Sequence, residues 1–231
     1  MNYIILNGKN SDFVQGLLIQ SLPPISKPLL RTQIEEIDGR DGDIVTPLGY
    51  SAYDKTISIG LYGNFNIDEV IKYFDTEGII TFSNEPYKYY RFQMISQIDF
   101  ERLVRYRTAN VTFHVQPFKW STIEFMKTFN IENETEIEIK NTGNVKAKPV
   151  ITLHGSGTIN LSLNGQQIFV IDLIDEITLD IASMEAYTGG ILKNRQVRGN
   201  YDNFLLNIGV NAISWTGNLT KIEIDKYSRW I

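Results

Sequence analysis

Two stretches in which apolar and polar residues alternate decide the fold: TISIGLYG, Thr56 to Gly63, and VTFHVQPF, Val111 to Phe118. Alternation with a period of two places every second side chain on the same face of a β-strand. The apolar residues that share a face are Ile57, Ile59 and Leu61 in the first stretch and Val111, Phe113 and Val115 in the second. The pattern recurs downstream in EIEIK, INLSLNG and KIEID, so the sequence predicts a mainly β protein.

One stretch, NIDEVIKYFDTEG, departs from this period and predicts a single helix from Ile67 to Asp75. Asn66 is a suitable N-cap, Glu69 occupies the capping-box position, and Gly78 can end the helix. The apolar residues expected to pack on a sheet, because they recur at helical spacing, are Ile67, Val70, Ile71 and Phe74.

The alternation is lost between Trp120 and Thr135, and short strands separated by NTGN, HGSG, LNGQQ and TGG turns follow. This change predicts a domain boundary near residue 128. Residues 1–128 would form a β-rich domain that contains the helix, and residues 129–231 an all-β sandwich.

Composition indicates a globular protein, since 42% of the 231 residues are hydrophobic and 21% are charged. No segment approaches the roughly 18 to 20 consecutive apolar residues of a membrane span. The N-terminus, MNYIILNGKNSDF, lacks the basic and apolar regions of a secretion signal, which predicts synthesis in a cytoplasm. The absence of cysteine excludes disulfides, thiolate catalysis and cysteine-bound zinc, and a formal net charge of −5 argues against general nucleic-acid binding.

The stretch IDGRDGDIVTPLGYS, Ile37 to Ser51, concentrates charges and glycines between two apolar runs. Asp41 and Asp43 could begin a calcium loop, but Val45 and Thr46 occupy positions that such a loop reserves for a ligand and a glycine. The dipeptide Asp-Gly occurs twice and suits tight turns, because glycine accepts a positive φ. The stretch therefore predicts a turn or hairpin tip.

No pattern of catalytic or metal-binding residues is present, so the sequence predicts no enzyme, metal site or cofactor. The two histidines, His114 and His154, lie on the polar sides of alternating strands, and no G-x-S-x-G elbow occurs. The glycines lead into strands rather than into a helix that could hold phosphate. Four carboxylates that could form a hydrolytic pair are expected to be solvated on a strand face: Asp172, Asp175, Glu176 and Asp180.

Basic and aromatic residues are interleaved in YKYYRF, Tyr87 to Phe92, and in ERLVRYR, Glu101 to Arg107, both interpreted as strands. Arginine and tyrosine together favour single-stranded nucleic acid or a protein interface. The acidic balance and the nearby Glu85, Asp99 and Glu101 favour a protein interface or cross-strand pairing.

The C-terminal half contains NTGNVKAKPVITLHGSGTINLSLNG, then ITLDIASMEAYTGG, then NFLLNIGVNAISWTGNLTKIEIDKYSRWI. In this order the segments resemble the second domain of the distal tail protein (Dit) family of siphophages that infect Gram-positive bacteria. The N-terminal half agrees, with YIILNGKNSDFVQGLLIQSLPPISKP, the IDGRDGD turn, the helix and TANVTFHVQPFKW. The resemblance spans almost the whole chain.

The resemblance implies a structural protein of a phage or prophage virion, located at the tail tip and made in the host cytoplasm. It implies a hexameric ring of N-terminal domains that joins the tail tube protein to the tail-associated lysin, fibre hub or baseplate, with a receptor-binding protein as a further partner. DNA would only pass through the ring. The C-terminal domains would be galectin-like β-sandwiches that project outward.

A ring needs unlike, complementary surfaces on its two flanks, and charged or aromatic segments suit that need. The residues expected at the subunit interface are Arg40, Asp41 and Asp43 in the turn and Arg91, Arg105 and Arg107 in the basic-aromatic segments.

Two competing functions are a carbohydrate-binding module for a host cell-wall saccharide and a wall-cleaving hydrolase. Galectins bind sugar with a His-x-Asn-x-Arg strand and a tryptophan, but His154 is followed by Gly155 and Ser156, so the fold alone does not imply sugar binding. Trp215 shares a strand face with Ile213 and is expected to pack inside the sandwich.

Overall fold

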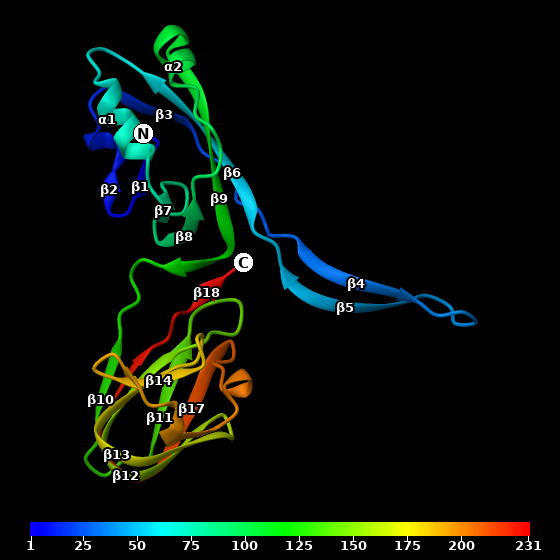
Figure 1. The fold of residues 1–231 in the computed structure, drawn as a ribbon, viewed down its shortest axis with the longest axis vertical. Helices are drawn as coiled ribbons and strands as arrows, with labels where there is room; N and C mark the ends of the chain where they lie inside the picture. Colours follow the sequence, from blue (N-terminus) through cyan, green and yellow to red (C-terminus); the bar gives the residue numbers. More distant parts are fainter. The chain divides into compact units, whose positions relative to one another are not determined.

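The computed structural model describes residues 1–231, which divide into two compact units, Met1–Thr122 and Ile123–Trp230 (Figure 1). The boundary that the sequence predicts, near residue 128, lies a few residues after the observed division between Thr122 and Ile123. The difference arises because β10 (Lys127–Asn130) pairs with a strand of the C-terminal sheet and therefore belongs to the second unit.

The N-terminal unit contains an antiparallel sheet in which segments distant in sequence are neighbours. In sheet order its strands are β2 (Lys9–Asn10), β1 (Ile4–Leu6), β7 (Gly78–Phe82), β8 (Lys88–Gln93), β9 (Thr108–Ser121), β6 (Tyr53–Leu61) and β3 (Leu17–Ser21). Strands β6 and β9 pair directly, with Ile57 opposite Val111. The alternating apolar residues of both strands are buried, so the prediction of a mainly β fold is confirmed.

Phe113 of β9 lies at the centre of the core of the N-terminal unit. Its ring centroid is 5.3 Å from that of Phe92, 6.1 Å from that of Phe82 and 6.4 Å from that of Phe74. All four rings are buried, and such edge-on or tilted pairs add to the stabilisation that burial provides.

Helix α1 (Ile67–Phe74) forms where the sequence predicts it, and the Asn66 side chain accepts hydrogen bonds from the backbone amides of its first turn. The predicted buried face is wrong at one position, because Ile71 is 37% exposed while Tyr73 is buried. The Tyr73 hydroxyl donates to the carbonyl oxygens of Ile4 and Lys9, both at 3.1 Å. These bonds favour a helix rotation that turns Ile71 outward.

A second helix, α2 (Phe100–Tyr106), occupies a segment that the sequence analysis assigned to a strand, so the prediction of a single helix is wrong. The Asp99 carboxylate caps the helix by accepting from the Arg102 amide at 2.8 Å. Only Leu103 is buried, and Arg107 ends the helix in the left-handed region at φ 60°. A short helix with a single buried residue gives little periodic signal. The interleaved basic and aromatic residues of this segment were therefore interpreted as a strand.

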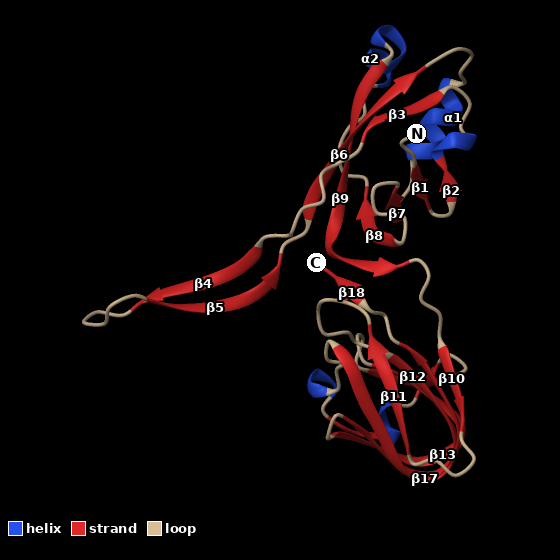
Figure 2. Ribbon diagram, turned by 180° about the vertical axis from the view of Figure 1, so that it is seen from behind, coloured by secondary structure: helices blue, strands red, loops and turns tan.

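Strands β4 (Leu30–Glu36) and β5 (Asp43–Tyr50) pair only with each other and form a two-stranded ribbon, here called the arm (Figures 1 and 2). The predicted turn lies between them. Gly39 and Gly42 have φ values of 82° and 79°, which explains why both Asp-Gly pairs carry glycine at the second position.

The C-terminal unit is built around a curled antiparallel sheet with strand order β10, β17, β12, β13, β14, β15, in which β11 also pairs with β17 and β16 with β13. Their bounds are β11 (Glu136–Asn141), β12 (Val150–Leu163), β13 (Gln166–Asp180), β14 (Glu185–Thr188), β15 (Ile191–Leu192), β16 (Val197–Gly199) and β17 (Gly209–Asp225). The remaining short elements of the chain are η1 (Ser11–Phe13), η2 (Asn194–Gln196), η3 (Tyr201–Asn203) and β18 (Arg229–Trp230).

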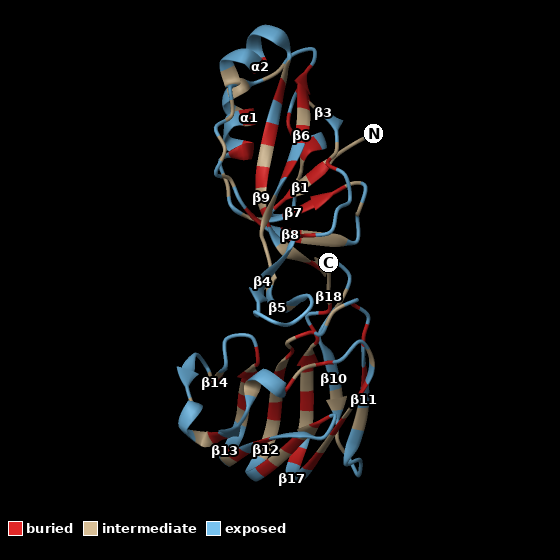
Figure 3. Cartoon of the chain, turned by 90° about the vertical axis from the view of Figure 1, so that its right-hand side faces the viewer, coloured by how far each residue is buried: buried red, intermediate tan, exposed pale blue.

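The long strands β12 and β17 bend where their pairing register shifts, next to Gly155 and Gly217. A Cβ at Gly217 would lie 2.4 Å from the Thr158 carbonyl oxygen, and φ is 106°, so only glycine fits there without strain. Buried and exposed segments alternate along these strands (Figure 3), and Trp215, 5% exposed, packs in the core as the sequence predicts.

Candidate functional site: surfaces for protein contact

The arm presents a large apolar area to solvent. Its exposed apolar side chains, between 38% and 72% accessible, are Leu29, Leu30, Ile34, Ile37, Val45 and Leu48. Both strands also have an edge whose backbone groups pair with no third strand. Isolated two-stranded ribbons are marginally stable in water, and contiguous exposed apolar surface usually marks an interaction site. The arm therefore has the properties of a segment that packs against another protein surface.

The end of the arm is acidic. Residues 35–43 carry five carboxylates and one guanidinium: Glu35, Glu36, Asp38, Arg40, Asp41 and Asp43. The three predicted interface residues of this segment, Arg40, Asp41 and Asp43, are all exposed. The apolar ribbon and its acidic end form one continuous candidate contact surface.

Arg91 lies on β8 in a stack of side chains. Its guanidinium is 4.8 Å from the ring centroid of Trp120, which in turn stacks on Tyr89 with an interplanar angle of 22°. Arg91 is exposed, and the stack fixes the orientation of its guanidinium.

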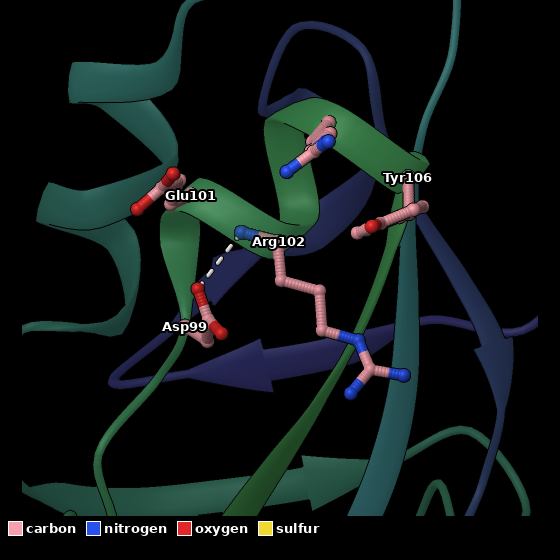
Figure 4. A pocket seen from close by; sticks show the side chains of 5 residues that line it. Asp99, Glu101, Arg102 and Tyr106 are labelled. Atoms are coloured by element: carbon pink, nitrogen blue, oxygen red, sulfur yellow. Dashed lines mark hydrogen bonds between the residues drawn. The ribbon is translucent and has the colours of Figure 1, made fainter.

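Three arginines gather on and just after α2. Arg102, Arg105 and Tyr106 line a shallow hollow of about 470 Å³ together with Asp99 and Glu101 (Figure 4). The Arg105 guanidinium lies 5.4 Å from the Tyr106 ring centroid. Sequence analysis did not select Arg102, although the three-residue spacing from Arg105 would place both on one helix face.

Arg107 follows the helix, and its guanidinium lies 4.5 Å from the ring centroid of Phe65. Arg105 lies on α2 and Arg107 directly after it, whereas Arg91 lies on β8. The predicted interface residues thus fall on three separate surfaces: the arm end, β8, and the α2 region.

Glu85, one of the acidic residues near the basic-aromatic stretches, is the centre of a buried network. Its carboxylate accepts from the Lys119 ammonium at 2.6 Å and from the Tyr90 hydroxyl at 2.5 Å. Burial alone would raise the pKa of Glu85, but these hydrogen bonds and the charges of Lys119 and Lys88 hold that pKa below its usual range. A buried pair satisfied in this way fixes the position of β8 against β9.

Lys55 lies in the same region, 5.0 Å from the Tyr90 ring centroid, and donates to the Pro24 carbonyl oxygen at 2.9 Å. Burial lowers the pKa of Lys55 to about 8, with Glu85 opposing and Lys119 reinforcing that shift. The network braces the sheet, and both oxygens of the Glu85 carboxylate are engaged, one by Lys119 and one by Tyr90.

The histidines are paired with carboxylates on exposed strand faces. His114 Nδ1 lies 2.7 Å from an Asp54 oxygen, and His154 Nε2 lies 3.2 Å from a Glu223 oxygen. Neither ring is hydrogen-bonded to a serine or threonine hydroxyl, and no group of three histidine or acidic side chains is placed to hold a metal ion. No helix has the length and apolarity needed to cross a membrane.

The four carboxylates considered for hydrolysis lie in different local environments. Asp180 caps a turn by accepting from the Ala182 and Ser183 amides, and Glu176 lies 3.6 Å from His154. Asp172 and Asp175 are exposed. These contacts favour local structural roles for Asp180 and Glu176.

The two-unit architecture matches that of a solved phage protein over nearly the full length of both chains. The chain is similar in fold to SPP1 Dit (gp 19.1), which is described as a paradigm of the hub adsorption apparatus in phages infecting Gram-positive bacteria. It is 17% identical to this chain, with a TM-score of 0.68 over 97% of this chain and 98% of that chain. The resemblance to the Dit family is thereby confirmed at the level of the fold.

Two structures of the phage p2 baseplate in its activated conformation, with Sr and with Ca, also match. Each is 9% identical over 97% of both chains, with TM-scores of 0.48 and 0.46. No family model matches the sequence, and no curated protein does.

Proposed function

We propose that this chain is the distal tail hub of a phage or prophage, a non-enzymatic structural protein of the virion. The observation that carries the proposal is the agreement of both units with SPP1 Dit over nearly the full length of the two chains. In this function the N-terminal units form a hexameric ring at the tail tip. The ring joins the tail tube protein to a tail-associated lysin, fibre hub or baseplate, and DNA passes through its opening.

The surfaces of the N-terminal unit support assembly into a ring. A closed ring of identical subunits requires two different surfaces that complement each other. The end of the arm is acidic, whereas the α2 region carries Arg102, Arg105 and Arg107 together with Asp99 and Glu101, so the two surfaces differ in the sign of their net charge. We assign the contact between neighbouring subunits to these two surfaces, with Arg91 as a further contact residue.

Charge reversal with rescue tests this assignment. Reversing the basic surface by Arg102→Glu with Arg105→Glu, or the arm by Asp41→Arg with Asp43→Arg, should weaken ring formation. Combining the two pairs should restore it, because opposite charges face each other again. The matched control, Arg195→Glu, changes an exposed arginine of the C-terminal unit and should leave assembly unchanged.

Assembly is measured by light scattering and by negative-stain imaging of the full chain, alone and with tail tube protein. The hub proposal predicts closed rings with a central opening and no release of soluble fragments from cell walls. A chain that remains monomeric even beside tail tube protein contradicts the ring. Rings that form in both reversed variants contradict only the assignment of the surfaces.

A further inference from the structure

The outer face of the C-terminal sheet carries a row of polar side chains, three uncharged and one a carboxylate, that crosses four strands. Gln167 of β13 lies opposite Ser162 of β12, Ser162 lies opposite Ser214 of β17, and Ser214 lies opposite Glu136 of β11. The residues that flank this row along the strands, such as Leu161 and Ile213, point into the core. Four polar side chains from distant parts of the sequence are therefore presented together on one surface.

A second row lies two residues along the same face. Asn160 is opposite Phe169 on one side and Thr216 on the other. Phe169 is 39% exposed, which places an accessible aromatic ring next to the amide and hydroxyl groups. The two rows together combine hydrogen-bonding groups with one apolar surface.

The polar side chains of both rows line a hollow of about 420 Å³, and Phe169 lies beside it, opposite Asn160. The hollow is formed mainly by Glu136, Asn160, Ser162, Gln167, Ser214 and Thr216. The Asn160 Oδ1 atom is shielded from solvent and accepts no hydrogen bond from the protein. An amide oxygen in this state is costly unless another molecule donates to it, so the hollow contains an acceptor suited to a ligand hydroxyl.

We propose that this hollow is a binding site for a neutral oligosaccharide. Amides and hydroxyls both donate and accept, which matches the hydroxyl groups of a sugar ring, and Phe169 offers a surface for the apolar face of that ring. The single carboxylate, Glu136, disfavours an anionic polymer. The site does not use the His-x-Asn-x-Arg strand of galectins, which this chain lacks.

The site adds a function to the proposed hub, because it would let the outer unit grip a surface glycan while the N-terminal unit assembles. It does not depend on the ring, since every lining residue belongs to the C-terminal unit. Its failure and the failure of the ring are therefore measured separately.

Titration of the isotope-labelled full chain with four neutral probes tests the site: chitotetraose, cellotetraose, maltotetraose and lactose. At least one should bind with a dissociation constant near 1 mM, in keeping with a shallow polar site, and shift the backbone amides of β12, β13 and β17 around the hollow. Asn160→Leu should abolish those shifts without lowering the melting temperature, because it removes an unpaired polar atom. Phe169→Ala should weaken binding at least several-fold.

The matched control is Thr178→Val, whose hydroxyl pairs with Thr152 elsewhere on the sheet. It should leave binding unchanged. The proposal is wrong if none of the four probes shifts these amides at about ten times the expected dissociation constant. It is equally wrong if Asn160→Leu binds like the unchanged protein, or if the shifts map to another surface.

Discussion

Substitution of Val70 by aspartate tests the rotation of α1, with Ile71→Asp as the neighbouring control. Val70 is completely buried and Ile71 is 37% exposed, although both residues lie on the apolar face that the sequence predicts. Loss of a buried valine costs about 1.5–3 kcal/mol, and an unpaired carboxylate in its place adds several kcal/mol more.

The sum for Val70→Asp is roughly 5 kcal/mol or more, comparable to the whole stability of a small domain at about 5–15 kcal/mol. Ile71→Asp keeps its carboxylate in water, so its cost is limited to the lost part of the apolar contact and to helix propensity, about 1–1.5 kcal/mol together. That corresponds to a decrease in melting temperature of about 4–12 °C.

Differential scanning calorimetry of the full chain is the suitable assay, because the two units have separate cores and the C-terminal transition serves as an internal reference. Val70→Asp should remove the N-terminal transition, whereas Ile71→Asp should shift it only modestly. Equal effects of the two substitutions, or a Val70→Asp protein that melts like the unchanged one, would refute the helix rotation described above.

Three further predictions follow from individual contacts. His114→Gln and His154→Gln should each change the free energy of unfolding by less than about 1 kcal/mol. Both should leave phage assembly intact, as measured by plaque formation. Loss of a hydrolytic activity in either variant would contradict a purely structural function. The pKa of Lys55 is lowered to about 8 from an ordinary value of 10.5, so the unfolded chain holds more protons than the folded chain above pH 8. The free energy of unfolding should therefore rise from pH 8 towards 10. Urea titrations of Lys55→Met should lack this rise. Gly217→Ala should lower the free energy of unfolding by about 1–3 kcal/mol, because its Cβ would approach the Thr158 carbonyl oxygen at a positive φ. A thermal melt unchanged from that of the parent would show that the bend tolerates a side chain.

Features that depend on a few consecutive residues could be predicted from the sequence. The alternation in β6 and β9 fixes which side chains are buried, Asn66 fixes the start of α1, and the paired Asp-Gly dipeptides fix the turn of the arm. The core position of Trp215 follows from the same period. In each case the signal is local, because backbone geometry alone relates neighbouring residues to a face, a cap or a turn.

The candidate contact surfaces could be predicted only in part. The exposed charges at the arm end follow from the turn, but the helix that carries Arg105 was missed because a short one-sided helix has a weak periodic signal. The buried pair of Glu85 and Lys119 was not predicted, because the two residues lie far apart in the chain. Two residues far apart in the sequence give no local sign that they pair, because only the alignment of their strands brings them together.

Tertiary structure alone decided which residues meet. The rotation of α1 depends on carbonyl oxygens of two distant strands, β1 and β2, that accept from Tyr73. The polar hollow of the C-terminal unit depends on the register of four strands. The physical reason is that a repeating pattern determines the face on which a side chain lies, whereas register, rotation and strand order are determined by contacts between segments far apart in the sequence.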